Sequence, residues 1–401
     1  MTNDTQVVIV GAGPTGATLA LLLVKRGITV KLIEASRNFR RAFRGEGLMP
    51  SGLDALAQMG LSSMLERIPH HTLDAWEFVI ENRLLFRVDE PIEPSGKRCT
   101  LVSQPALLEA LIEEASTYPN FEFVQNAPVQ DLLWRDERIS GVTLGSGEIY
   151  ADLVVAADGR NSIVRQRANL SVEQKSQSFD ILWFKLADSP RFESENIFYS
   201  IVRDRHAFGL FRSSEGNLQL GWALRENSNN WKQVDDWSEI LASASPPWLA
   251  EHFRRNAKTI DRPVLLSVVV GRCSHWYAPG LLLLGDAAHP MSPIRAQGIN
   301  MALRDIIVAA NYLVPLLREA AEHTVIDAVL SKIQAEREPE IVRVQQLQAQ
   351  EAAQADLLEK SAFIRWGASS LAPLLRYPIR QSWIARQRQL RQGVTQVKLT
   401  V

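Results

Sequence analysis

A glycine-rich loop near the start of the chain is the sequence feature that most restricts the fold. Residues 6–10 (QVVIV) form a short apolar run rich in β-branched side chains, which predicts a buried strand of a parallel sheet. The pattern G-x-G-x-x-G follows at once, from Gly11 to Gly16. Residues 18–26 then predict a helix, and residues 28–33 predict a second strand. Together these segments predict a βαβ unit of a doubly wound α/β fold.

The residue types in this unit are those that a dinucleotide requires. The first glycine permits a tight turn, Gly13 lets a pyrophosphate approach the backbone, and Gly16 lets the helix pack closely on the strand. The start of the helix offers free N–H groups to phosphates. Glu34 can accept a hydrogen bond from a ribose hydroxyl and disfavours NADP, so NAD and FAD remain as candidates. The predicted contacts are Gly11, Gly13, Pro14, Thr15, Gly16 and Glu34.

Two later segments repeat the pattern of a buried strand that ends in a polar turn. Residues 152–157 predict a strand that ends at Asp158 and Gly159. Residues 281–284 predict another strand, followed by Gly285-Asp286-Ala287. Residues 297–300 (QGIN) open a helix that we expect to continue over residues 301–313.

With these three motifs in this order, the sequence resembles the FAD-dependent aromatic hydroxylases, which are single-component flavoprotein monooxygenases of the p-hydroxybenzoate hydroxylase type. The resemblance covers nearly the whole chain up to about residue 350. It implies an FAD-binding Rossmann-like domain of the glutathione-reductase type. It also implies an inserted, mainly antiparallel β-sheet substrate domain and a C-terminal helical region.

The resemblance also implies roles for individual residues. Asp286 would hold a ribityl hydroxyl of FAD. The helix that starts near Gly298 would point its positive end at the flavin, with Asn300 supporting the same edge. Pro293 corresponds to a proline whose carbonyl faces the substrate side of the flavin, which implies a catalytic position. The other implied cofactor contacts are Arg44, Gln104, Asp158, Gly159, Gly285, Ala287 and Ile299.

Structural alternatives stay open for several of these residues. Asp286 could be only a helix N-cap, and Asp158 only a turn residue. Arg44 could be a surface arginine, Gln104 a capping residue, and His289 a structural histidine.

Arg295 is a departure from the family pattern, because relatives have glycine at this place in the loop beside the flavin. Arginine adds bulk and a permanent positive charge. Four interpretations remain open: the side chain binds an anionic substrate, stabilises reduced flavin, fills the usual pocket, or points to solvent. The first two make Arg295 a candidate catalytic residue.

The resemblance implies a monooxygenase that uses FAD, NAD(P)H and O2. Because the sequence holds a single G-x-G-x-x-G motif, we expect FAD to occupy it without a covalent link and NAD(P)H to bind transiently. In this family reduced flavin takes up oxygen as a C4a-hydroperoxide, which exclusion of water protects. Two alternatives remain: a flavin-dependent reductase or oxidase on the same scaffold, and a non-catalytic flavin-binding partner of another enzyme. No Cys/His spacing indicates a metal site.

The FAD-binding domain is expected to be discontinuous, over residues 1–72, 98–172 and 268–345. Residues 73–97 and 173–267 would form the substrate domain, and residues 346–401 a C-terminal helical segment. Strand-like stretches at 181–186, 196–202, 206–211 and 218–224 predict an antiparallel sheet over the flavin. An aromatic or lipophilic substrate is predicted from the candidate pocket residues Trp183, Phe198, Phe208, Phe211 and Trp222.

Charge and cysteine content restrict the cellular location of the protein and the kinds of partner it can bind. The 44 basic and 45 acidic residues leave a net charge of -1, without the basic surplus of a nucleic-acid-binding protein. Two cysteines and the lack of a basic, signal-like start favour a cytoplasmic chain. Residues 360–401 hold eight basic residues and no acidic ones, with aromatic residues between them. This segment either packs on the rest of the chain or makes peripheral contact with a membrane. The oligomeric state stays open.

Overall fold

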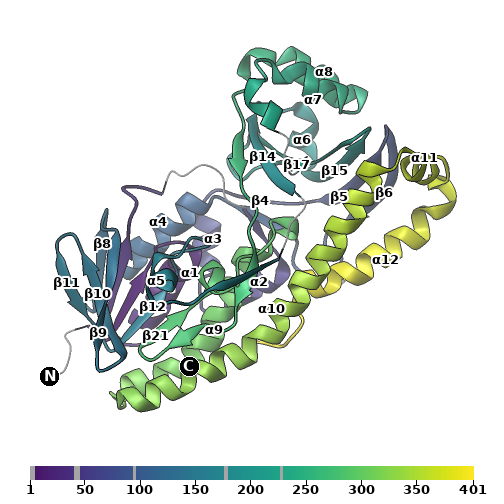
Figure 1. The fold of residues 1–401 in the computed structure, drawn as a ribbon. Coiled ribbons are helices and arrows are strands. Elements are labelled where there is room, and N and C mark those ends of the chain that lie inside the picture. Colours follow the sequence, from purple (N-terminus) through teal and green to yellow (C-terminus); the bar gives the residue numbers. More distant parts are fainter. Residues whose placement is uncertain (1–4, 40–45, 94–95, 176–178, 226–228) are drawn as a thin grey trace.

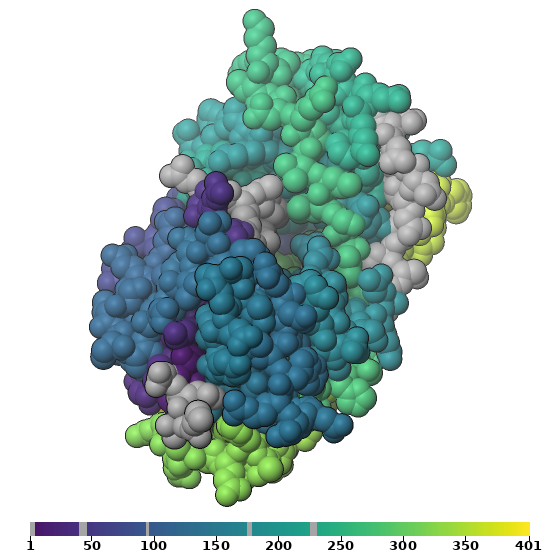
Figure 2. Space-filling model, turned by 60° about the vertical axis from the view of Figure 1, so that its left-hand side comes forward, coloured from purple at the N-terminus to yellow at the C-terminus, as the bar shows by residue number. Residues whose placement is uncertain are grey.

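The computed structural model describes residues 5–39, 46–93, 96–175, 179–225 and 229–401. These residues form an α/β fold with two lobes, which are separated vertically in Figure 1 and again in the turned view of Figure 2. One lobe is built on a six-stranded sheet and the other on a seven-stranded sheet. The α/β class predicted from the sequence is therefore confirmed.

The six-stranded sheet is parallel except at one edge, and it is buried on both faces. Alternate side chains of its strand β1 enter two different apolar cores, with Val7 and Ile9 on one face and Val8 and Val10 on the other. This two-sided burial explains why the sequence shows continuous apolar runs instead of alternation. In spatial order the strands are β20 (Tyr277–Ala278), β21 (Leu281–Leu283), β12 (Leu153–Ala156), β1 (Val7–Val10), β2 (Val30–Glu34) and β8 (Phe121–Gln125).

The seven-stranded sheet takes strands from two separate parts of the chain. Four strands predicted from the sequence are present, and two more come from residues 75–89. Helices α7 (Trp237–Ser243) and α8 (Pro247–Arg255) pack on one of its faces. In spatial order the strands are β18 (Val264–Leu266), β14 (Phe179–Leu186), β17 (Leu218–Arg225), β16 (His206–Arg212), β15 (Ile197–Arg203), β5 (Ala75–Ile80) and β6 (Arg83–Asp89).

Smaller elements complete the two lobes. Short sheets are formed by β3 (Gly47–Leu48), β4 (His70–Thr72) and β7 (Thr100–Val102), by β9 (Val129–Arg135), β10 (Arg138–Leu144) and β11 (Gly147–Tyr150), and by β13 (Val172–Lys175) and β19 (Val270–Cys273). The remaining α-helices before residue 260 are α1 (Pro14–Val24), α2 (Pro50–Gln58), α3 (Ser62–Arg67), α4 (Gln104–Ala115), α5 (Ile163–Arg167) and α6 (Pro190–Ser194).

Four helices form the C-terminal part of the chain. Helix α9 (Gln297–Arg318) includes the predicted helix 301–313 and is mostly buried. The long helix α10 (His323–Lys360) runs past both lobes and leads to α11 (Ala362–Ser370) and α12 (Ala372–Gln392), as Figure 1 shows. The last residues return to the first lobe, where Arg304 donates a hydrogen bond to the carbonyl of Thr395 at 2.6 Å.

Buried ion pairs fix α10 against α9. Arg337 donates to Asp305 at 2.8 Å and to Glu340, and Arg304 donates to Glu340 at 3.0 Å. Asp305 also binds His289 at 2.6 Å, so His289 has the structural role that the sequence left open. Burial alone would raise the pKa of Glu340, but the two guanidinium groups outweigh it and lower that pKa to about 2.

The depressed pKa gives this network a defined pH dependence. Because the folded-state pKa of Glu340 lies below its ordinary value of 4.5, the stabilisation is fully present above about pH 4.5 and is lost as the pH falls toward 2. We therefore expect Glu340→Gln to flatten the acid dependence of stability across this window.

Glu340→Gln should also lower the free energy of unfolding at neutral pH by about 3–5 kcal/mol, because the buried guanidinium of Arg304 loses its carboxylate partner and that of Arg337 keeps only Asp305. Glu338→Gln, on the same helix, is the matched control. Its partner Arg272 is 25% exposed, so the cost should stay below about 1 kcal/mol. Urea unfolding of both variants measures the difference, and equal effects would contradict the prediction.

Candidate active site

Three loops meet at the carboxyl ends of β1, β12 and β21. A Cβ atom at Gly11 would lie 2.5 Å from the carbonyl oxygen of Ala157, and one at Gly285 would lie 2.5 Å from Oγ1 of Thr15. Both glycines also have positive φ angles, +98° and +58°, which side chains rarely adopt. Only glycine therefore allows these loops to come together, and the sequence motifs predicted for the cofactor share one edge of the sheet.

The first loop has the geometry of a phosphate-binding turn. Glu34, at the end of β2, accepts the backbone N–H of Ala12 at 2.9 Å and that of Ser36 at 2.8 Å, which fixes the loop against the strand. At Gly13 a Cβ atom would meet nothing within 4 Å. The space in front of this residue is thus open for a ligand, directly before the N-terminus of α1.

Asp158 combines a structural role with an unused acceptor. Its Oδ2 atom accepts the backbone N–H groups of Ile163 and Val164 at 2.8 and 3.2 Å, so it caps α5. Its Oδ1 atom is buried and has no hydrogen-bond partner among the described residues. Burial raises the pKa of this carboxyl group, although the backbone and Ser162 hydrogen bonds oppose the shift. The free acceptor beside the glycine loop is what a bound dinucleotide could satisfy.

Asp286 lies in a short 3-10 helix (Gly285–Ala287) after β21, close to the first turn of α9. A Cβ atom at Gly298 would lie 3.6 Å from its Oδ1 atom. Pro293, just before α9, is exposed although Met291 and Ser292 before it are buried. A carboxylate therefore lies close to the N-terminus of α9, and an exposed proline comes shortly before that helix in the chain.

Asn300 is placed differently from the expectation that it supports the flavin directly. Its Oδ1 atom accepts the N–H of Met49 at 2.8 Å, and its Nδ2 atom donates to the carbonyls of Gly47 and Ala296 at 3.1 and 2.6 Å. The side chain is fully buried. Asn300 thus joins β3, the loop before α9 and the start of α2.

The other implied cofactor contacts belong to several different elements. Gln104 is the first residue of α4, after Ser103. Gly159 follows β12 with φ +84°, and Ala287 is buried and accepts a hydrogen bond from Arg165 at 2.9 Å. Ile299 packs partly into the core beneath α9. Arg44 lies outside the described residues.

Arg295 is neither exposed nor a free cation. Its Nε atom donates to Glu351 of α10 at 2.8 Å, and its side chain is 9% exposed. The guanidinium lies 5.2 Å from the ring centres of Trp76 and Trp383 and 5.5 Å from that of Phe78. The interpretation that Arg295 points to solvent is therefore wrong, and its charge is paired with Glu351. That it binds an anionic substrate or stabilises reduced flavin stays a prediction. The side chain fills space between the loop, the second sheet and the C-terminal helices.

One face of the seven-stranded sheet carries aromatic residues toward this loop. Phe198 lies over Gly209 and stacks with Phe211 at 5.5 Å, and Trp183 lies over Gly221. Because Gly209 and Gly221 have no side chain, the large rings fit against the sheet. Three of the five predicted pocket residues, Trp183, Phe198 and Phe211, therefore share this face.

The other two predicted pocket residues lie on the opposite face. Phe208 and Trp222 stack on each other at 5.6 Å and pack in the core beneath α7 and α8. Side chains alternate between the two faces of a strand, so Phe208 and Phe211 cannot both face the loop. We leave Phe208 and Trp222 out of the pocket.

Several aromatic residues on or against this face were missed from the sequence, among them Phe78, Phe86, Trp76 and Trp383. Trp76 of β5 lies 4.9 Å from Phe198, and Trp383 of α12 lies 6.1 Å from Trp76. The only sequence signal for Trp76 was the apolar pattern of residues 75–80. For Trp383 there was no such signal, because its partners lie about three hundred residues earlier in the chain.

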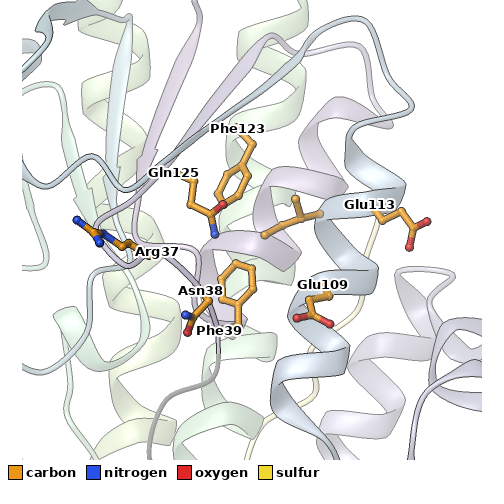
Figure 3. Close-up of a pocket in the computed structure, with 8 residues that line it drawn as sticks. Arg37, Asn38, Phe39, Glu109, Glu113, Phe123 and Gln125 are labelled. Atoms are coloured by element: carbon orange, nitrogen blue, oxygen red, sulfur yellow. The ribbon is translucent and has the colours of Figure 1, made fainter.

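A separate hollow of about 390 Å³ lies beside the first sheet, between α4 and the ends of β2 and β8 (Figure 3). Phe39 and Phe123 stack within it at 6.3 Å, and Glu109 and Glu113 border it on the α4 side. None of the predicted cofactor residues lines this hollow. The glycine loop, not the hollow, therefore defines the candidate site.

The residues of the sheet edge fit FAD. Gly13 leaves the backbone accessible, and Asp286 lies close to the N-terminus of α9. Asp158 keeps a buried acceptor atom that has no partner in the part of the chain that the structure describes. Gly13 and the start of α1 would hold the pyrophosphate, Glu34 the ribose, and Asp286 the ribityl chain.

Comparison with known proteins agrees with this fit. A family model described as an FAD binding domain matches residues 4–346. A 6-methylpretetramide 4-monooxygenase from Streptomyces rimosus is 32% identical, over 86% of this chain and 82% of the relative. A p-hydroxybenzoate hydroxylase from Acinetobacter baylyi is 24% identical, over 80% of each chain. The solved structure of P. aeruginosa PqsL in complex with 2-aminobenzoylacetate has a TM-score of 0.77 at 22% identity, covering 88% of this chain and 97% of that one.

The chain belongs to the family of FAD-dependent aromatic hydroxylases, because the family model and the 32%-identical relative each cover most of its length. It is an FAD-dependent oxidoreductase of the monooxygenase type, so the class of enzyme expected from the sequence is confirmed.

The role of Gly13 can be tested apart from folding. Gly13→Ala should leave the fold intact, because the added methyl group meets no atom of the described residues within 4 Å and φ is -72°. It should weaken FAD binding about tenfold or more, since the methyl group stands where a pyrophosphate approaches. Gly145→Ala, in an exposed turn, is the matched control. Flavin titration of the apoprotein measures both, and unchanged affinity in Gly13→Ala would place FAD elsewhere.

Proposed function

We propose that this enzyme hydroxylates an aromatic or lipophilic small molecule, with NAD(P)H as transient electron donor and O2 as co-substrate. The observation that carries this proposal is the aromatic face of the second sheet, which is joined to the loop at residues 292–296 through the contact of Arg295 with Trp76. Trp183, Phe198 and Phe211 would then form the wall opposite the flavin.

The chain's own groups would bind, orient and shield the reactants. The N-terminus of α9 would lie beside the flavin and favour negative charge there, because the helix dipole is positive at that end. The aromatic rings would exclude water from the substrate side. Bound FAD supplies the redox chemistry, accepting hydride from NAD(P)H and activating O2.

Arg295 would act as a positioning residue. It and Ala296 both have left-handed backbone angles, with φ of 58° and 51°, which cost of order 1–3 kcal/mol in residues with side chains. The pairing with Glu351 and the three rings offset that cost and hold the loop. Because its charge is compensated by Glu351, we propose a neutral aromatic or lipophilic molecule as the substrate class of this chain. In this it would differ from the relative named for p-hydroxybenzoate, whose substrate carries a carboxylate.

Several further assignments complete the proposal. We place the cofactor domain at residues 1–72, 98–172 and 268–345, and the substrate domain at 73–97 and 173–267. The first lobe would bind FAD without a covalent link. We also propose a cytoplasmic location, as the two cysteines and the start of the sequence favour.

The two faces of the sheet provide a matched pair of variants. Phe198→Leu should raise KM for an aromatic substrate several-fold and divert more NAD(P)H oxidation to peroxide, because water reaches the site. Phe208→Leu, on the opposite face, should lower thermal stability and leave coupling unchanged. Substrate-dependent NAD(P)H oxidation, product and peroxide are measured together. Oxidation that yields only peroxide with every aromatic substrate would favour an oxidase or reductase.

A further inference from the structure

Helices α11 and α12 form a hairpin at one end of the molecule (Figure 1). This hairpin carries large apolar side chains that are exposed to solvent. Phe363 is 78% exposed, Leu374 is 76% exposed, and Trp366 and Tyr377 are 63% and 68% exposed. Apolar groups gathered in this way mark an interaction surface more often than scattered ones do. We call this surface the apolar tip; it comprises Phe363, Ile364, Trp366, Leu371, Leu374, Leu375 and Tyr377.

The hairpin that carries the apolar tip is fixed to the rest of the protein by buried contacts. Arg365 of α11 is buried, pairs with Glu81 at 2.6 Å and donates to the carbonyl of Leu358 at 2.9 Å. Trp383 of α12 packs on Phe78 and Phe86 of the second sheet at 5.2 and 6.0 Å. The exposed side chains thus belong to ordered helices whose opposite sides are buried.

The exposed charged residue within the tip is basic, and the acidic groups near its base are paired. Of the eight basic residues in residues 360–401, Arg365 and Arg391 are buried against glutamates and Lys360 pairs with Asp356. Arg376 is exposed within the tip itself, and Arg83 of β6 reaches the carbonyl of Ser369 at 3.4 Å. At the base, the acidic groups of Glu81 and Asp356 are paired with Arg365 and Lys360.

We propose that the apolar tip docks this protein on an anionic lipid surface. Apolar aromatic and leucine side chains would enter the headgroup boundary, and Arg376 would face the phosphates. A second copy is a poorer occupant, because it would bring the same positive charge against this one. This inference does not depend on the reaction proposed above.

The docking would be peripheral. Within the described residues, one helix has the length and hydropathy of a membrane span, Ile294–Arg318, and 72% of its apolar window is buried inside the protein. That helix contains α9 and forms the core of the first lobe. The tip is therefore the surface offered to lipid, with both helices lying along the interface.

Sedimentation of the FAD-loaded protein with vesicles tests the proposal. Vesicles of phosphatidylcholine with phosphatidylglycerol should bind at least tenfold more protein than phosphatidylcholine alone, and added salt should reduce the difference. The variant Phe363→Ser/Trp366→Ser/Leu374→Ser should lose at least tenfold in vesicle affinity. The control Trp134→Ser/Val264→Ser/Val325→Ser removes apolar groups exposed elsewhere and should change it less than twofold.

Flavin content and thermal unfolding, unchanged in both triple variants, would show that each has folded. Arg376→Gln should weaken binding to anionic vesicles and leave binding to neutral vesicles unchanged. Equal sedimentation of the two triple variants, or no binding of the wild type to anionic vesicles, would overturn the proposal. A dimer in analytical ultracentrifugation that the tip variant dissociates, without vesicle binding, would assign the tip to a second copy instead.

Discussion

Glycine at two positions, Gly11 and Gly285, allows the cofactor site to form. A Cβ atom at Gly11 or Gly285 would lie 2.5 Å from a neighbouring loop, too close for any relaxed contact. With glycine at both positions, the ends of β1, β12 and β21 converge, and Asp158 and Asp286 follow two of these strands directly. The doubly wound sheet brings these ends to one edge, where ligands bind in folds of this kind.

The C-terminal third of the chain is part of this architecture and not an appendage. Helix α10 is fixed to α9 by Arg337 and Arg304, which share Glu340 in the interior. The same helix provides Glu351, which holds Arg295 beside the start of α9. Packing of the last hundred residues thus reaches the loop that would face the flavin, and changes in α10 are expected to act on that loop.

Arg295 shows how a departure from a family pattern can be compensated. Glycine would adopt the left-handed backbone here without strain, whereas arginine is strained. Its side chain, however, lies among Trp76, Phe78 and Trp383 and pairs with Glu351, and these contacts exist only because three distant segments meet. Arginine at this position strains the backbone, but its side chain connects the loop before α9 to the second sheet and to the C-terminal helices.

The sequence by itself determined the α/β class, the strands around Gly11 and the family, because local apolar patterns and glycine spacing encode a dinucleotide turn directly. It also located strands of the second sheet, but not which face each residue takes, so Phe208 and Trp222 were grouped with Phe211. Tertiary structure alone decided that Asn300 binds backbone, that Arg295 is paired, and that Trp383 joins Trp76. The physical reason is that these contacts join residues far apart in the chain, whose partners follow from how helices and sheets pack and not from any local pattern.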